Sequence, residues 1–179
     1  SAAGTMKRLS LELGGHSPFV VLDDADVAEA AAAATRRSFS NVGQICIAVN
    51  RILVAESIAD EFVNAVAHHA AQFILGHGLE PDVTLGPAAH PSVLKTATAH
   101  VADALERGAE MVHGGCAVNP VDLAYGAFFE PTVLDRVPLG ARMMNEETFG
   151  PVVAVHRYSE SDDVVRLANA SDFGLAAYV

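Results

Sequence analysis

The chain has 179 residues, of which 51% are hydrophobic and 18% are charged, and its formal net charge is −11 at pH 7. This length allows one domain with a substantial core, or a domain plus a fragment of another, and the composition is that of a folded α/β protein and excludes a disordered chain. The acidic balance argues against nucleic acid and anionic membranes as partners, and no apolar run approaches the roughly 18 residues of a membrane span. With two cysteines and no signal-peptide pattern, we expect a cytoplasmic protein with reduced thiols.

The first quarter of the chain predicts two strands and a helix. Residues 7–13 alternate loosely and predict a strand that ends at a Gly-Gly pair, where the backbone can turn sharply. The β-branched run at 19–22 predicts a buried parallel strand. Asp26 with Glu29 fits a capping box, and an Ala-rich helix is expected from there to Phe39.

The middle of the chain repeats this alternation. We expect a strand at 51–55 and then a helix that Ser57 caps and that ends at 76–78. Four apolar residues of that helix share one face: Phe62, Val66, Ala70 and Phe73. Pro91 suits the first turn of a third helix, and Gly108 suits its C-terminal cap.

The last third continues the pattern. It predicts a strand at 110–113, a turn-rich loop at 114–127, an extended segment at 128–134, a strand at 152–156 and a helix at 161–169. Strands that alternate with helices along the whole chain predict an α/β fold, with a largely parallel sheet flanked by helices.

Cys46 is the first candidate for chemistry. It follows a turn that contains Asn41, Gly43 and Gln44, residues that we expect to shape and orient the loop, and it precedes an apolar run at 47–49. A thiol placed there can be exposed on one side and held rigidly on the other. A thiolate is a strong nucleophile, and a nearby backbone N–H can stabilise the oxyanion that forms when it attacks a carbonyl. A lone cysteine is more often a small buried hydrophobic residue, so the nucleophile hypothesis depends on the motifs around it.

Five short motifs follow one another along the chain. They are Leu-Glu-Leu-Gly-Gly at 11–15, Gly-Gln-Ile-Cys at 43–46, Phe-Glu-Pro-Thr at 129–132, Glu-Glu-Thr-Phe-Gly-Pro at 146–151, and Ala-Asn at 168–169 with Phe-Gly-Leu at 173–175. Together, from about Lys7 to the last residue, they closely resemble the aldehyde dehydrogenase superfamily. The resemblance implies that family's catalytic-domain fold, a small aldehyde as substrate, NAD or NADP as cofactor, and a homodimer or homotetramer for the full-length protein.

The resemblance also implies a domain division. Residues 1–13 correspond to the end of the family's cofactor-binding domain, and residues 14–179 correspond to its catalytic domain, truncated at the C-terminus. The sequence has no Gly-rich dinucleotide fingerprint, and its Lys and Arg residues are too scattered to cradle phosphates. Cofactor binding would depend largely on a domain outside these residues, so we expect no NAD(P)-dependent oxidation from the 179 residues alone.

Two catalytic residues follow from the resemblance, Cys46 and Glu12. Cys46 would attack the aldehyde to give a thiohemiacetal, pass hydride to the nucleotide and remain as a thioester, with its own backbone N–H as one oxyanion donor. Glu12 would activate the water that hydrolyses the thioester, so a free acid is the expected product. Apolar neighbours and two adjacent glycines predict that Glu12 is partly buried, with a raised pKa. The alternative is an edge-strand carboxylate paired with Lys7 or Arg8.

The cofactor site would include Glu147, Phe149 and Gly14. In similar proteins the second Glu of the 146–151 motif binds the nicotinamide ribose hydroxyls, and the Phe packs near the nicotinamide ring. From composition alone, two adjacent carboxylates before Phe-Gly-Pro are equally typical of a solvated turn. The eight histidines show no ligand spacing, so we predict no metal site, and Cys116 has no base at a defined distance.

The substrate is not fixed by these motifs. Several stretches are similar to the succinate-semialdehyde dehydrogenase branch, including His16 and residues 78–81. That branch places an Arg six residues before the catalytic Cys, where it can pair with a distal carboxylate, but this chain has Ser40. It also often has a second Cys two residues after the nucleophile, where this chain has Ala48. We therefore expect a related aldehyde dehydrogenase of unassigned substrate, with a neutral or aromatic aldehyde as one candidate.

Two other classes of function stay open from sequence. A cysteine-dependent esterase or hydrolase could use Cys46 with a His base, and turnover of an activated ester without nucleotide would favour it. A non-catalytic assembly module would be favoured if the complete gene had no upstream cofactor domain.

Overall fold

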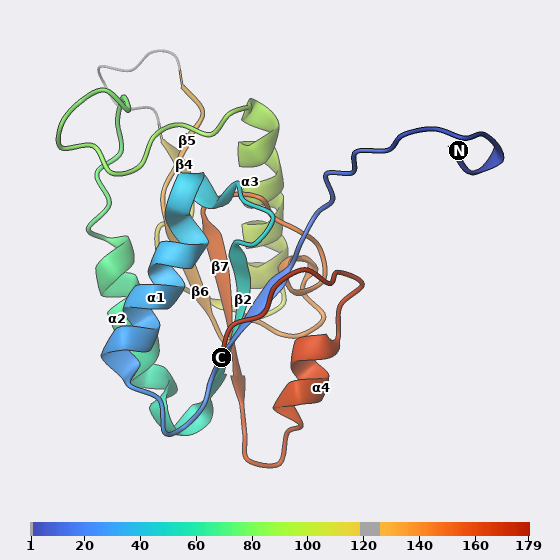
Figure 1. The fold of residues 1–179 in the computed structure, drawn as a ribbon. Coiled ribbons are helices and arrows are strands. Elements are labelled where there is room, and N and C mark those ends of the chain that lie inside the picture. The colour runs from blue at the N-terminus through green and yellow to red at the C-terminus, as the bar shows by residue number, and fades with distance from the viewer. Residues whose placement is uncertain (1, 119–125) are drawn as a thin grey trace.

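The computed structural model describes residues 2–118 and 126–179, and at its centre is a five-stranded sheet (Figure 1). In sheet order the strands are β1 (Ser17–Val21), β2 (Val49–Ala55), β7 (Val152–Tyr158), β6 (Thr132–Asp135) and β3 (Glu110–His113). The first four run parallel, and β3 pairs antiparallel with β6. Two short strands, β4 (Ala117–Val118) and β5 (Phe128–Phe129), pair separately. The predicted largely parallel α/β sheet is confirmed.

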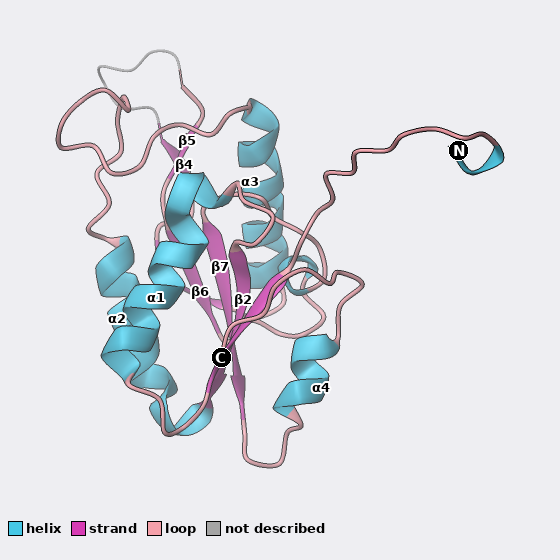
Figure 2. Cartoon of the chain, in the orientation of Figure 1, coloured by secondary structure: helices cyan, strands magenta, loops and turns pink. Residues whose placement is uncertain are grey.

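Helices pack on both faces of this sheet, as Figure 2 shows. They are α1 (Val27–Phe39), α2 (Ala59–Ala70), α3 (Pro91–Glu106) and α4 (Val164–Asn169). One buried cluster joins the sheet to α1 and α2, and a second joins the opposite face to α3 and α4. No helix in the described residues is both long and apolar enough to cross a bilayer.

Strand β2 has a continuous apolar run, residues 52–55, because both faces of the sheet are covered at this strand. Ile52 and Val54 belong to the cluster under α1 and α2, whereas Leu53 and Ala55 belong to the cluster under α3 and α4. Successive side chains of a strand point to opposite faces, and both faces are covered here, so no polar alternation is possible. The strand predicted at 51–55 is confirmed and begins two residues earlier, at Val49.

Helix boundaries were predicted well where a cap was visible. Asp26 accepts the predicted hydrogen bond from the Glu29 N–H (3.0 Å), and α1 ends at Phe39 as expected. Pro91 opens α3, and Gly108 lies just beyond its end with a φ of +96°.

Four predicted elements are corrected by the structure. Residues 7–13 form no strand, because no described strand pairs with them. Ser57 is not a cap but lies in a 3-10 turn before α2, which ends at Ala70 rather than at 76–78. The last helix starts at Val164, three residues later than predicted. The predicted loop at 114–127 contains β4, and its residues 119–125 lie outside the described part.

Candidate active site

The candidate site lies at the amino edge of the parallel sheet. Ser17 at the start of β1 pairs with Val49 at the start of β2, and the register of β2 on β7 sets Val49 level with Val152. Ser17, Val49 and Val152 therefore lie side by side. Each is preceded, three positions earlier in the chain, by a predicted site residue: Gly14, Cys46 and Phe149. The register therefore brings three segments that are distant in sequence to one edge of the sheet. Sites in open α/β sheets usually lie at the opposite, carboxyl edge.

A strained turn presents Cys46. Asn41, Val42 and Gly43 all have a positive φ, of 51°, 62° and 71°. Such a conformation costs on the order of 1 kcal/mol or more at each non-glycine residue. The side-chain amide of Asn41 donates to the Gln44 carbonyl (3.1 Å), and that of Gln44 donates back to the Asn41 carbonyl (2.9 Å). These reciprocal bonds support the predicted loop-shaping role of both residues.

Contacts from outside the turn fix its position. The side-chain oxygen of Gln44 accepts from the Ala89 N–H (2.9 Å), which ties the turn to the segment before α3. A Cβ on Gly43 would collide with the Gly150 carbonyl. On the far side of Cys46, the Tyr178 hydroxyl donates to the Ile47 carbonyl (2.9 Å). The turn is therefore held from three directions, and its strain is compatible with a single conformation.

Cys46 itself is half-buried and not in a disulfide. No acceptor in residues 2–118 or 126–179 takes a hydrogen bond from its backbone N–H, whereas the Ala48 N–H donates to the Ile45 carbonyl (2.8 Å). A free N–H beside the sulfur is the donor that an oxyanion on an attacked carbonyl carbon requires.

Glu12 and Cys46 line the same hollow. It measures about 590 Å³ and is formed by residues 11–14 and 172–175 together with Cys46. Glu12 is exposed, so the predicted partial burial is wrong for this chain. No ion pair in the described part of the chain joins Glu12 to Lys7 or Arg8, the alternative that sequence left open. Its carboxylate is thus free to act on a molecule in the hollow.

Glu147 packs against the glycine pair. Its Oε1 accepts from the Gly15 N–H (3.0 Å), and a Cβ on Gly14 would lie 2.6 Å from Oε2. The side chain is half-buried, so it is not part of a solvated turn. Phe149, two residues on, has a φ of +50° and is 38% exposed. The structure therefore brings Gly14 and Glu147 together and leaves the Phe149 ring accessible.

Replacing Gly15 by alanine is expected to lower kcat/KM of the full-length protein by about 10²-fold, the cost of a misplacement of about 1 Å at reacting groups. The reason is steric, because a Cβ at this position would collide with the Cys46 carbonyl. Steady-state kinetics with a substrate that the full-length protein turns over would measure the loss. Gly78→Ala is the matched control, since no atom lies within 4 Å of a Cβ there. Wild-type turnover by Gly15→Ala would show that this close packing is not needed.

His16, which follows the glycine pair, is buried and neutral. It is 3% exposed, its Nδ1 lies 3.3 Å from the Asn50 amide nitrogen, and burial lowers its pKa to about 4. In the unfolded chain the pKa is 6.5, so between pH 6.5 and 4 only the unfolded state takes up the proton. The contribution of His16 to the free energy of unfolding is therefore fully present above pH 6.5, and it should be lost as the pH falls from 6.5 to 4.

The free energy of unfolding should fall by about 3 kcal/mol across this window, because each pH unit between the two pKa values is worth about 1.4 kcal/mol. Urea unfolding of the full-length protein at a series of pH values would measure it. The His16→Asn variant should lose this part of the pH dependence, and substitution of the exposed His77 by Asn should not. Equal slopes for wild type and His16→Asn would contradict the assignment.

Cys116 is a weaker candidate nucleophile. It is exposed, and its thiol donates to the Glu130 carboxylate (3.1 Å), a hydrogen bond that raises the pKa of the thiol. A raised pKa leaves less thiolate at neutral pH.

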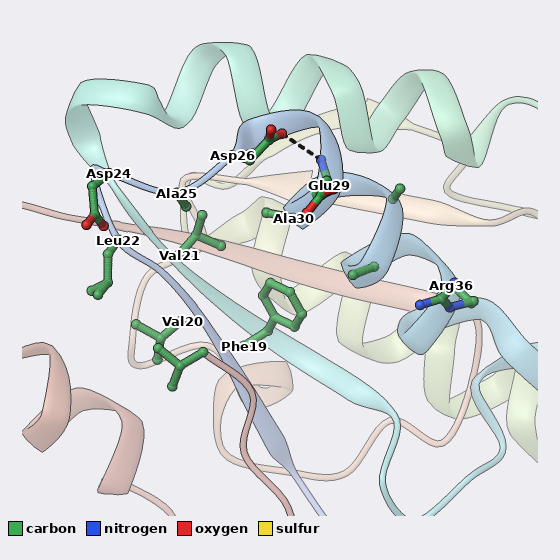
Figure 3. Close-up of a pocket in the computed structure, with 13 residues that line it drawn as sticks. Phe19, Val20, Val21, Leu22, Asp24, Ala25, Asp26, Glu29, Ala30 and Arg36 are labelled. Atoms are coloured by element: carbon green, nitrogen blue, oxygen red, sulfur yellow. Dashed lines mark hydrogen bonds between the residues drawn. The ribbon is translucent and has the colours of Figure 1, made fainter.

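Another hollow, of about 610 Å³, lies between β1 and α1 and is drawn in Figure 3. Its lining is mostly apolar, and its Asp26 is already used as the α1 cap. It contains neither cysteine nor histidine, so it offers no nucleophile or imidazole base. No group of three or more metal-ligating side chains occurs in the described residues.

Sequence reasoning missed two residues that support the site. Tyr178 reaches the Cys46 turn across 131 positions, and His100 reaches Thr148 of the 146–151 motif across 48 positions. Neither contact leaves a local pattern in the sequence, because both depend on how distant elements pack.

The aldehyde dehydrogenase family model matches residues 1–179. The 3-sulfolactaldehyde dehydrogenase of Pseudomonas putida is 43% identical over 176 residues, covering 98% of this chain and 35% of that protein. The NADP(+) succinate-semialdehyde dehydrogenase of Escherichia coli (strain K12) is 41% identical over 176 residues, covering 98% and 36%. The crystal structure of succinate-semialdehyde dehydrogenase from Burkholderia pseudomallei has a TM-score of 0.92 at 41% identity, covering 99% and 36%. The chain thus spans little more than a third of these relatives.

Proposed function

The chain belongs to the aldehyde dehydrogenase family, and on that basis we propose that the full-length protein oxidises an aldehyde to a carboxylic acid with NAD or NADP. Cys46 is the nucleophile, Glu12 the base for hydrolysis, and Glu147, Phe149 and Gly14 belong to the cofactor site. The observation that best supports this is the shared hollow of Cys46 and Glu12. Residues 14–179 are the catalytic domain, and residues 1–13 end the cofactor domain.

The first step is the addition of the thiolate to the aldehyde. The Cys46 sulfur attacks the carbonyl carbon, and the resulting oxyanion accepts a hydrogen bond from the free Cys46 N–H. Loss of hydride from that carbon leaves a thioester on the sulfur. The strained turn and its outside contacts keep the sulfur fixed through both steps, which lowers the entropic cost of reaching the transition state.

The second step is hydrolysis. Glu12 takes a proton from a water molecule, the hydroxide adds to the thioester carbonyl, and the Cys46 thiolate leaves as the acid forms. An exposed carboxylate can meet water in the hollow, which a carboxylate buried in an ion pair could not do.

The residues around Gly14 fit a nicotinamide nucleotide. Glu147 uses Oε1 for the Gly15 N–H, and no donor in the described residues bonds to Oε2. A Cβ at position 14 would fill the space beside Oε2, so glycine leaves room there for ribose hydroxyls, which a carboxylate accepts well. When bound, the nucleotide supplies a hydride acceptor.

We also propose that the full-length protein is a homodimer or homotetramer and that the 179 residues alone do not oxidise aldehydes.

The deciding experiment is an aldehyde panel with NAD and with NADP on the full-length protein, followed by nucleotide absorbance and product analysis. Neutral, aromatic and anionic aldehydes belong in the panel. Ser40 is uncharged, and its hydroxyl donates to the Arg36 carbonyl. Arg36 and Ser40 line a separate hollow whose lining includes neither Cys46 nor Glu12. No nucleotide reduction with any aldehyde would overturn the proposal. Turnover of an activated ester without nucleotide would then favour a hydrolase.

A further inference from the structure

The two candidate cofactor residues Glu147 and Phe149 flank a buried threonine. Thr148 is 2% exposed, and its Oγ1 lies 3.0 Å from Nδ1 of His100. His100 is 1% exposed and belongs to α3, which packs in the core through Ala97 and Val101. A rigid helix therefore reaches the segment between the two cofactor residues through one side chain.

The other ring nitrogen of His100 holds the residue before Glu147. Nε2 lies 3.2 Å from Oε2 of Glu146, which also accepts from the Arg142 guanidinium (2.8 Å). These contacts, that of Arg142 first, hold the pKa of Glu146 down at about 2, so this carboxylate is ionised and accepts. Nε2 must therefore carry the ring proton, and Nδ1 must accept from the Thr148 hydroxyl. Burial lowers the pKa of His100, which favours the neutral ring that this arrangement requires.

The segment that His100 contacts has an irregular backbone. Residues 145–151 form neither helix nor strand, and Phe149 has a positive φ. Backbone hydrogen bonds hold its two ends, from the Asn145 and Glu146 N–H groups to the Arg142 carbonyl and from the Thr132 N–H to the Pro151 carbonyl, and in the described residues none of the backbone bonds involves Thr148. Side-chain bonds also fix Asn145 and Glu146 from residues 139–142, and the Gly15 N–H donates to Glu147. The two bonds of His100 join this segment to α3, and one of them is the side-chain bond of Thr148.

We propose that His100 is a positioning residue for the nucleotide: by bonding residues 146 and 148, it fixes Glu147 between them in the orientation that receives the ribose. The inference rests on the proposed role of Glu147. It predicts that the loss of the Thr148 bond weakens nucleotide binding without removing any group that touches the nucleotide.

The test uses nucleotide affinity of the full-length protein, measured by isothermal titration calorimetry, and KM and kcat beside it. Thr148→Val should raise Kd and the nucleotide KM about tenfold, the effect of one lost hydrogen bond, with a much smaller change in kcat. His100→Phe loses the bond to Glu146 as well, so its Kd and nucleotide KM should rise by at least as much. The double variant should bind nucleotide no more weakly than His100→Phe alone, because that variant already lacks the bond to Thr148. His100→Asn should restore most of the affinity, since its side-chain oxygen can replace Nδ1 as acceptor, and His100→Gln should not.

Val101→Ala, at the neighbouring buried position of α3, controls for a loss of stability. It should lower Tm and leave Kd unchanged. If His100→Phe and Thr148→Val lower Tm but bind nucleotide like the wild type, His100 is only structural and the inference is wrong. Glu147→Gln distinguishes a failure of the proposed function from a failure of the inference about His100. If this variant keeps wild-type affinity, the proposed role of Glu147 is wrong, and the inference is wrong with it. If it loses affinity while the His100 and Thr148 variants keep it, only the inference fails.

Discussion

Replacement of Cys46 by alanine in the full-length protein is expected to reduce aldehyde oxidation by at least about 10⁴-fold, the scale of loss when an enzyme loses its nucleophile. Neither a thiohemiacetal nor a thioester can form without the sulfur. The loss should fall on kcat, while nucleotide affinity and Tm stay close to the wild-type values, because the side chain is small and only half-buried. Stopped-flow measurement of nucleotide reduction would detect even a single turnover.

Cys116→Ala is the matched control, since the chain has just these two cysteines. Its thiol is exposed and bonded to Glu130, so its removal should leave turnover unchanged. Mass spectrometry of the acylated wild-type enzyme should place the acyl group on the peptide that contains Cys46. An acyl group on Cys116, or normal oxidation by Cys46→Ala, would show that the nucleophile is assigned wrongly.

The fold was predictable where apolar runs and caps are local signals. Strand β2 is apolar because helices cover both of its faces, and α1 begins where Asp26 bonds the Glu29 N–H. The strand predicted at 7–13 shows the limit of such signals. Leu9, Leu11 and Leu13 do alternate, but they are 63%, 67% and 70% exposed. A strand needs a partner for its backbone groups, and the described residues provide none.

The candidate site could be proposed from sequence as a set of residues but not as a geometry. The five motifs located Gly14, Cys46 and Glu147, and the structure brings their segments to one edge of the sheet. What brings them there is the strand register, which pairs Ser17 with Val49 across 32 positions of sequence. No window of sequence contains that information. The exposure of Glu12 was missed for a related reason, because its apolar neighbours suggested burial although they are themselves exposed.

Glu12→Gln is expected to separate the two halves of the reaction. The amide cannot accept a proton from water, so hydrolysis should slow by about 10² to 10⁴-fold, the usual contribution of a general base. Thiol addition and hydride loss do not use Glu12, so the first turnover should remain fast. Rapid mixing should then show a burst of reduced nucleotide of about one equivalent per active site, and intact mass spectrometry should show the acyl group retained on Cys46.

Asp172→Asn provides the matched control, because Asp172 is an acid that lines the same hollow as Glu12 and Cys46. If Glu12 acts by position and basicity, the Asp172 variant should hydrolyse the thioester at the wild-type rate, although it lowers the negative charge of the hollow by the same amount. Accumulation of acyl-enzyme in both variants would mean that charge in the hollow matters more than a placed base. Accumulation in the Asp172 variant alone would transfer the role of base to that residue. Either result would leave the Cys46 chemistry intact, because a thioester that persists is itself evidence that the sulfur was the nucleophile.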